Sequence, residues 1–199
     1  MPCSKCHYKA PIGSPRVLFL DTELSPSFGA YYSPRWETSI LWPTQEWRFL
    51  CFSYAWDDGK IVNIQSFNEK FTVMKLWKLL DQADIVICHN VAFDVGKAYA
   101  KFLEYHLPPP RPFKTFCTLR KYRKLAKMES NKLGDLGEKL GFGDKIDIEG
   151  KRFWRKVLEK DPVTIKRMIQ YCNHDVRLLR KIYKVIEPFF PPIKLKQIK

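Results

Sequence analysis

Four acidic residues in this chain stand in three short motifs that are far apart in the sequence. Asp21 and Glu23 follow one apolar run, Asp94 follows another, and Asp175 lies within a long helical pattern. Carboxylate oxygens are hard ligands that suit Mg²⁺ or Mn²⁺ rather than zinc. With four carboxylates, two ions about 3.5–4 Å apart could prepare an attacking water and stabilise the leaving oxygen of a phosphodiester. The motifs therefore indicate a metal site for phosphodiester hydrolysis.

The first two motifs must be positioned by strands. The apolar run at 17–20 predicts a buried strand over residues 17–21. Because side chains alternate along a strand, Asp21 and Glu23 should share one face, roughly 7 Å apart. A second strand is predicted at 84–88, and a helical pattern follows it, so Asp94 should lie at a strand-to-helix junction. Ligands of open sheets bind at such junctions.

The third motif belongs to a long amphipathic helix. Asp161 is the expected N-cap, Pro162 takes the first helical position, and the apolar pattern continues to Ile186. Tyr171 and Asp175 are four residues apart and so share a helix face. A carboxylate on an inward face is costly unless it is paired or bound to a metal.

The remaining patterns predict an α/β fold with a mixed five-stranded sheet flanked by helices. Strands are expected at 49–56 and 60–67, joined by a tight turn at 57–59, and at 113–119. We expect one domain over residues 16–188, between an N-terminal tail (1–15) and a basic C-terminal tail (189–199).

In this order, the motifs Asp-x-Glu, Asn-x-x-Phe-Asp and Tyr-x-x-x-Asp resemble those of the DEDD (DnaQ-like) 3′-5′ exonucleases, which have a ribonuclease H-like fold. The resemblance runs over about 17–187 and includes a helix around 131–137. Tyr171 is typical of the tyrosine branch, which contains the proofreading domains of family A and family B DNA polymerases. The histidine branch has its side chain five residues before the last aspartate, where this chain has Gln170. His174 is expected to be a surface or packing residue.

The resemblance implies a role for each motif residue. Asp21, Glu23, Asp94 and Asp175 would bind two Mg²⁺ or Mn²⁺ ions, and Tyr171 would orient or help to deprotonate the attacking water. Leu24 follows the glutamate, where relatives often place a wedge against the terminal base. The substrate-binding candidates are Thr22, Leu24, His89, Asn90, Phe93, Lys121 and Lys124.

Charge and hydropathy limit the possible partners. The net charge is +14, from 35 basic and 21 acidic residues, which points to a polyanionic partner. Residues 111–127 include seven basic and no acidic side chains, a composition that favours phosphate contact.

No apolar stretch is long enough to span a membrane, and the N-terminus lacks a signal peptide. We therefore expect a cytoplasmic protein, in the host cytoplasm if it is phage-encoded.

The six cysteines are expected to be reduced. Cys3 and Cys6 form half of a zinc-knuckle pattern, and His7 could add a third ligand, but no second CxxC exists in the chain. A tail without zinc is therefore favoured over a zinc site. Four other cysteines lie in apolar contexts and are expected in the core: Cys51, Cys88, Cys117 and Cys172.

A long insertion at 24–46 separates the first motif from the second strand and is rich in aromatic residues. Exposed aromatic rings beside an active site could stack on unpaired bases. Burial against the sheet edge is the favoured interpretation for most of them. The residues concerned are Phe28, Tyr31, Tyr32, Trp36 and Trp42.

We therefore predict a metal-dependent 3′-5′ exonuclease acting on single-stranded DNA, because an unpaired 3′ end enters a closed carboxylate pocket more easily than a duplex does. Nothing resembling a polymerase follows in the chain, so the enzyme would act alone or in trans to a DNA polymerase or another replication protein, in replication or repair. The alternatives are a 3′-5′ exoribonuclease of the same fold, since no 2′-OH contact can be identified, and a catalytically silent nucleic-acid-binding module. A structural zinc protein or a packaging protein is less favoured.

Overall fold

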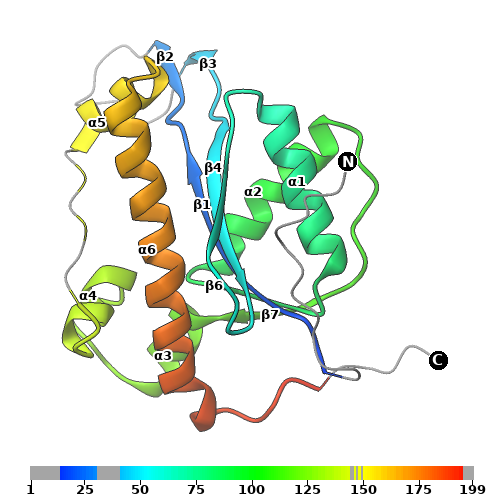
Figure 1. The fold of residues 1–199 in the computed structure, drawn as a ribbon, viewed down its shortest axis with the longest axis vertical. Helices are drawn as coiled ribbons and strands as arrows, with labels where there is room; N and C mark the ends of the chain where they lie inside the picture. The colour runs from blue at the N-terminus through cyan, green and yellow to red at the C-terminus, as the bar shows by residue number, and fades with distance from the viewer. Residues whose placement is uncertain (1–13, 31–40, 144–145, 147, 149, 195–199) are drawn as a thin grey trace.

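A five-stranded mixed sheet forms the centre of the protein (Figure 1). The computed structural model describes residues 14–30, 41–143, 146, 148 and 150–194. The strand order is β5-β4-β1-β6-β7, with β1 antiparallel to β4, β4 antiparallel to β5, and β6 parallel to both β1 and β7. The bounds are β1 Val17–Leu24, β4 Phe49–Trp56, β5 Val62–Gln65, β6 Ile85–Cys88 and β7 Lys114–Cys117. The predicted mixed five-stranded sheet is confirmed.

Helices cover both faces of this sheet. In Figure 1, α6 crosses one face with α3, α4 and α5 beside it, and α1 and α2 lie on the opposite face. The bounds are α1 Glu69–Gln82, α2 Val91–Glu104, α3 Thr118–Leu125, α4 Leu133–Lys139, α5 Gly150–Leu158 and α6 Pro162–Ile186, and a short 3₁₀ turn, η1 Glu187–Phe189, follows. None of the described helices is long and apolar enough to cross a membrane.

The alternation of side chains along β1 divides the core into two layers. Leu18 and Leu20 pack in the layer that includes α1 and α2, whereas Phe19 packs in the layer that includes α6. Asp21 and Glu23 continue the row of Phe19 and therefore face α6. The predicted shared face of these two acidic residues is confirmed.

Helix α6 begins as its sequence predicts. The Asp161 side chain accepts a hydrogen bond from the Thr164 backbone N–H at 2.7 Å, and Pro162 is the first helical residue. The helix has 25 residues and lies against β1 and β4. Its middle part therefore passes the end of β1 that carries the acidic residues.

Several predicted boundaries differ from the structure. The strand expected at 113–119 ends at Cys117, because Thr118 begins α3, where its hydroxyl oxygen lies 3.3 Å from the Cys88 carbonyl oxygen of the neighbouring strand. The strand expected at 60–67 is limited to residues 62–65. Within the expected C-terminal tail, Phe190 and Ile193 are partly buried against the α6 layer.

The insertion at 24–46 contains a small two-stranded sheet, β2 Phe28–Ala30 and β3 Trp42–Gln45. Phe28 is 38% exposed and Trp42 is 58% exposed, so the expected burial is wrong for these two aromatic residues. Tyr31, Tyr32 and Trp36 lie outside the described residues.

The four predicted core cysteines are buried and have no disulfide partner: Cys51, Cys88, Cys117 and Cys172. This arrangement confirms their expected packing role. The possible zinc ligands Cys3 and Cys6, and His7 with them, lie outside the described residues.

The contact between α4 and α6 leads to a stability prediction. A Cβ atom added at Gly137 would come within 2.4 Å of a Leu178 methyl and 2.9 Å of its Cγ, and Leu178 is buried. We expect Gly137→Ala to destabilise the protein by about 1–3 kcal/mol in urea unfolding. Gly96→Ala in α2 is the control, because the space around Gly96 is open, and it should be neutral or stabilising by up to about 1 kcal/mol. Equal effects of the two substitutions would contradict this packing account.

Candidate active site

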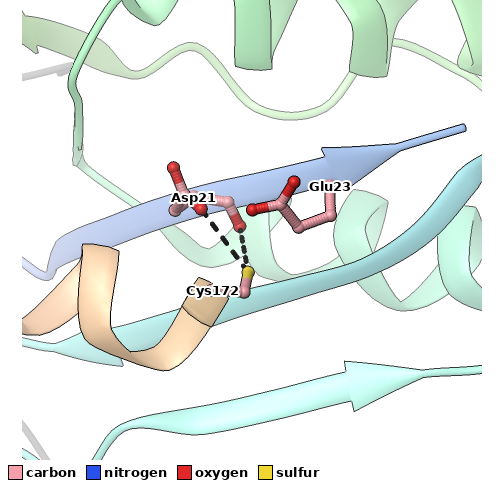
Figure 2. A group of neighbouring side chains, drawn as sticks. All are labelled: Asp21, Glu23 and Cys172. Atoms are coloured by element: carbon pink, nitrogen blue, oxygen red, sulfur yellow. Dashed lines mark hydrogen bonds between the residues drawn. The ribbon is translucent and has the colours of Figure 1, made fainter. Parts of the chain in front are cut away.

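Asp21 and Glu23 lie on β1 directly against Cys172 of α6 (Figure 2). The Cys172 thiol donates to the Asp21 carboxylate at 3.5 Å and approaches the Asp21 backbone carbonyl at 3.6 Å. One ligand atom from each of the three side chains lies within 4.8 Å of the others. The carboxylates of Asp21 and Glu23 are therefore close enough to share a metal ion, whereas the Cys172 thiol keeps its hydrogen and donates it to Asp21.

Asp94 reaches β1 from the opposite face of the sheet. Asn90 adopts a left-handed backbone conformation, with φ 81°, which turns the chain from β6 into α2. Asp94 in the first turn of α2 then accepts a 2.8 Å hydrogen bond from the Thr22 hydroxyl, and both side chains are buried. Thr22 thus fixes Asp94 to the strand segment between Asp21 and Glu23.

Two of the acidic side chains, Glu23 and Asp94, are buried, and Asp21 is half-buried. Burial raises the pKa of Asp21 well above its ordinary value, and the negative charges of Glu23, Asp175 and Asp94 raise it further. Burial likewise raises the pKa of Glu23, with Cys51, Asp175 and Asp94 adding to the effect. Burial raises the pKa of Asp94 to about 7, although the hydrogen bond from Thr22 opposes the shift.

No lysine or arginine of the described ranges forms an ion pair with Asp21, Glu23 or Asp94. A group of buried carboxylates without cationic partners is stable only if protons or a bound cation neutralise it. The all-oxygen carboxylate donors fit a hard divalent cation such as Mg²⁺ or Mn²⁺.

Tyr171 and Asp175 lie half-buried on α6 beside this group. Burial raises the pKa of the Tyr171 phenol, and the charges of Asp175, Glu23 and Asp21 and a hydrogen bond with Asp175 raise it further. The phenol of the metal-free protein is therefore protonated at neutral pH. In this state Tyr171 can orient a water molecule by hydrogen bonding but cannot act as a base.

His89 has both ring nitrogens engaged within the protein. Nδ1 lies 2.9 Å from the Thr118 hydroxyl, and Nε2 lies 2.8 Å from the Asn131 carbonyl. Burial lowers the pKa of His89, so the ring is neutral near pH 7. His89 thus connects the loop after β6 to α3 and to the segment before α4. His174 is half-buried on α6, where burial lowers its pKa.

An open cleft of about 420 Å³ lies next to Glu23. Leu24 and Phe93, two of the predicted substrate-binding residues, line it, and Phe93 is 44% exposed. The motifs did not indicate Trp47, Lys97 and Trp154, which complete the apolar and basic walls. The full lining is Thr22, Glu23, Leu24, Ser25, Pro26, Ser27, Trp47, Phe93, Lys97 and Trp154. For Lys97 the sequence does contain a signal, because this residue lies one helical turn after Phe93 and therefore on the same face of the helix.

The predicted basic candidates do not line this cleft. The Lys121 ammonium lies over the rings of Phe116 and Phe190, at 5.4 and 4.5 Å from their centres. Lys124 is exposed on α3. Arg111 donates to the Asp81 backbone carbonyl at 2.6 Å, so part of the basic segment supports the fold.

Comparisons with known proteins show to which superfamily this chain belongs. The family model of the RNase H superfamily matches residues 36–187, and the chain belongs to this superfamily. Its members are usually nucleases that use divalent metals, and the predicted ribonuclease H-like fold is confirmed. The matched range contains Asp94 and Asp175 but begins after Asp21 and Glu23. A sequence search of curated proteins found no match.

A solved structure similar to this chain is the family B DNA polymerase from the hyperthermophilic archaeon Pyrobaculum calidifontis. The TM-score is 0.67 at 14% sequence identity, with 88% of this chain covered. The chain spans about a quarter of the length of that polymerase, since the match covers 25% of it. This similarity supports the fold alone.

Burial of Asp94 predicts a pH-dependent stability in EDTA. Its pKa is raised to about 7 in the folded protein, against about 4 when unfolded, so its stabilising contribution is complete below pH 4 and is lost as the pH rises to 7. Asp94→Asn should therefore gain stability relative to the wild type between pH 4 and 8, as measured by urea unfolding. Millimolar Mn²⁺ should reduce that gain at pH 8, because the ion stabilises only the wild-type site. A difference that does not change with pH would contradict the burial of this charge.

Proposed function

We propose that this protein is a metal-dependent 3′-5′ exonuclease of the DEDD type, tyrosine branch, which hydrolyses single-stranded DNA. The observation that carries the proposal is that buried Glu23 and Asp94 lie close enough to half-buried Asp21 for their charges to act on it, while none of the three has a described cationic partner. These residues come from two elements, β1 and α2, and α6 adds Asp175, whose charge acts on both Asp21 and Glu23. Membership of the RNase H superfamily and the charge of +14 support a nucleic-acid substrate.

Asp21, Glu23, Asp94 and Asp175 would hold two divalent ions. When bound, Mg²⁺ or Mn²⁺ ions supply Lewis-acid activation of water and charge stabilisation at the scissile phosphate. Thr22 is a positioning residue in this scheme, because its hydrogen bond fixes the Asp94 carboxylate. Cys172 donates to Asp21 and so restricts the rotation of that carboxylate.

The protein groups have distinct roles in the hydrolytic step. Tyr171, as a neutral phenol hydrogen-bonded to Asp175, would orient the attacking water. The cleft next to Glu23 would hold the terminal nucleotide, with Leu24 and Phe93 against its base. The water would attack phosphorus and lose a proton, the P–O3′ bond would break, and O3′ would take up a proton from solvent, which gives a 5′-mononucleotide and a strand shorter by one nucleotide.

We further propose a role in DNA replication or repair, with a DNA polymerase or another replication protein as a partner, because a DNA polymerase contains a region of the same fold. An enzyme of this fold that hydrolyses RNA would be an exoribonuclease. A module that only binds nucleic acids would leave both DNA and RNA intact.

Substitution of a single carboxylate tests the site. We expect Asp175→Asn or Asp21→Asn to lower hydrolysis of 5′-labelled single-stranded DNA by more than a hundredfold in Mg²⁺ or Mn²⁺, with the fold retained by circular dichroism. The reason is that loss of one ligand charge weakens metal binding while it relieves repulsion in the cluster. Asp58→Asn is the matched control, because Asp58 is exposed in the turn between β4 and β5, and it should keep full activity.

The products of this assay show which nucleic acid is the substrate. A descending ladder on DNA that is absent on RNA of the same sequence agrees with the proposal, and a ladder on RNA alone would identify an exoribonuclease. Intact DNA and RNA with the wild-type protein would contradict exonuclease activity. Near-normal turnover by Asp175→Asn would contradict the assignment of the site.

Removal of the Tyr171 hydroxyl tests whether this residue acts in the hydrolytic step or only packs against the site. Tyr171→Phe keeps the ring, so we expect kcat to fall about 10²-fold or more while KM for single-stranded DNA changes by less than threefold. Steady-state kinetics with the labelled strand gives both values. Equal losses in kcat and in substrate binding would mean that Tyr171 only packs against the site.

A further inference from the structure

Trp47, which precedes β4, is one of the residues that line the cleft next to Glu23. The adjacent Arg48 backbone N–H donates to the Ser25 hydroxyl at 2.9 Å, and the Ser25 N–H donates to the Arg48 carbonyl at 2.8 Å. One residue further on, the Phe49 N–H donates to the Glu69 carboxylate at 2.8 Å. The backbone directly after Trp47 is therefore fixed to the end of β1 and to α1.

Two lysines of α2, Lys97 and Lys101, lie over the Trp47 ring. Their ammonium groups are 4.2 and 4.7 Å from its centre. Lys101 is buried and neutralised, since it lies 3.4 Å from a Glu69 oxygen and 2.8 Å from a Glu104 oxygen. Lys101 therefore has an evident structural role, which is to join α2 to α1 and Trp47.

Lys97 differs from Lys101 in its surroundings. It is only half-buried and lines the cleft, and no carboxylate in the described part of the chain lies within ion-pair distance of it. The cation–π contact with Trp47 restricts the motion of the ammonium without cancelling its charge. The cleft thus presents a fixed, unneutralised cation beside apolar walls from Leu24, Phe93 and Trp154.

We propose that Lys97 binds a backbone phosphate of an unpaired strand whose base occupies the cleft, and that Trp47 positions Lys97 for this contact. The inference rests on the proposed exonuclease function and names a specificity-determining residue of the same site. The cleft volume of about 420 Å³ is within the range of ligand pockets and suits a base that is not paired. The aromatic and apolar walls can contact the face of an unpaired base, which a duplex does not offer. Lys97 would therefore favour single strands over duplex.

Binding measurements on an inactive background test the proposal. Asp175→Asn prevents degradation, and a fluorescein-labelled oligothymidylate of about twelve residues is titrated at several salt concentrations in Mg²⁺. Adding Lys97→Met should weaken single-strand binding about tenfold and reduce the slope of log K against log[salt] by about 0.7, the value for one lost phosphate contact. Binding of a blunt duplex of the same length should change by less than twofold.

Matched variants separate the charge of Lys97 from its packing. Lys97→Arg should restore most of the affinity and the salt slope, because the positive charge remains. Lys78→Met is the control, since Lys78 is exposed on α1 and does not line the cleft, and it should leave both quantities unchanged. Lys97→Gln also removes the charge, so it should show the same tenfold loss and the same reduced slope, and it replaces Lys97→Met in the test if the methionine variant folds poorly.

Two results would overturn the inference. One is an unchanged salt slope in both Lys97→Met and Lys97→Gln, and the other is an equal loss of single-strand and duplex binding. Failure of the exonuclease proposal gives a different pattern. In that case the wild-type protein leaves all strands intact, while the slope change at Lys97 shows that the cleft binds single strands.

Discussion

The placement of several negative charges in one buried space is the constraint on which the rest of this structure depends. Glu23 and Asp94 are buried and Asp21 is half-buried, and the charges of Glu23, Asp94 and Asp175 raise the cost of ionising Asp21. A fold does not gain stability from such a group without a counter-charge. The polar contacts around the group hold the carboxylates in place, and the Thr22–Asp94 hydrogen bond is the clearest example.

Both layers of the fold contribute to this space, and β1 connects them. Alternation along the strand directs Asp21 and Glu23 toward α6 and leaves Thr22 on the side of α2, where it meets Asp94. A slip of β1 by one residue against β4 would exchange these faces and separate the carboxylates. The registry of Asp21 with Ser53 and of Glu23 with Cys51 is therefore as necessary to the site as the acidic residues themselves.

Much of this arrangement could be predicted from the sequence, because it depends on short-range periodicity. Two-residue alternation predicted the shared face of Asp21 and Glu23, and the Asp161–Pro162 start predicted α6. Contacts between segments that are far apart in the chain produce no periodic pattern in the sequence, so they could not be predicted in this way. The pairing of Trp47 with Lys97, the double engagement of His89 and the packing of Phe190 each join elements far apart in the chain. The exposure of Phe28 and Trp42 also depends on how the insertion folds, which composition alone does not determine.

The central claim is that the buried carboxylates form a divalent-metal site, and anomalous diffraction from a crystal soaked in Mn²⁺ tests it most directly. The account predicts anomalous peaks between the side chains of Asp21, Glu23, Asp94 and Asp175, and the loss of at least one of them in a crystal of Asp21→Asn. A well-ordered cluster with no anomalous peak at saturating Mn²⁺, or Mn²⁺ bound only at other places on the surface, would contradict the account.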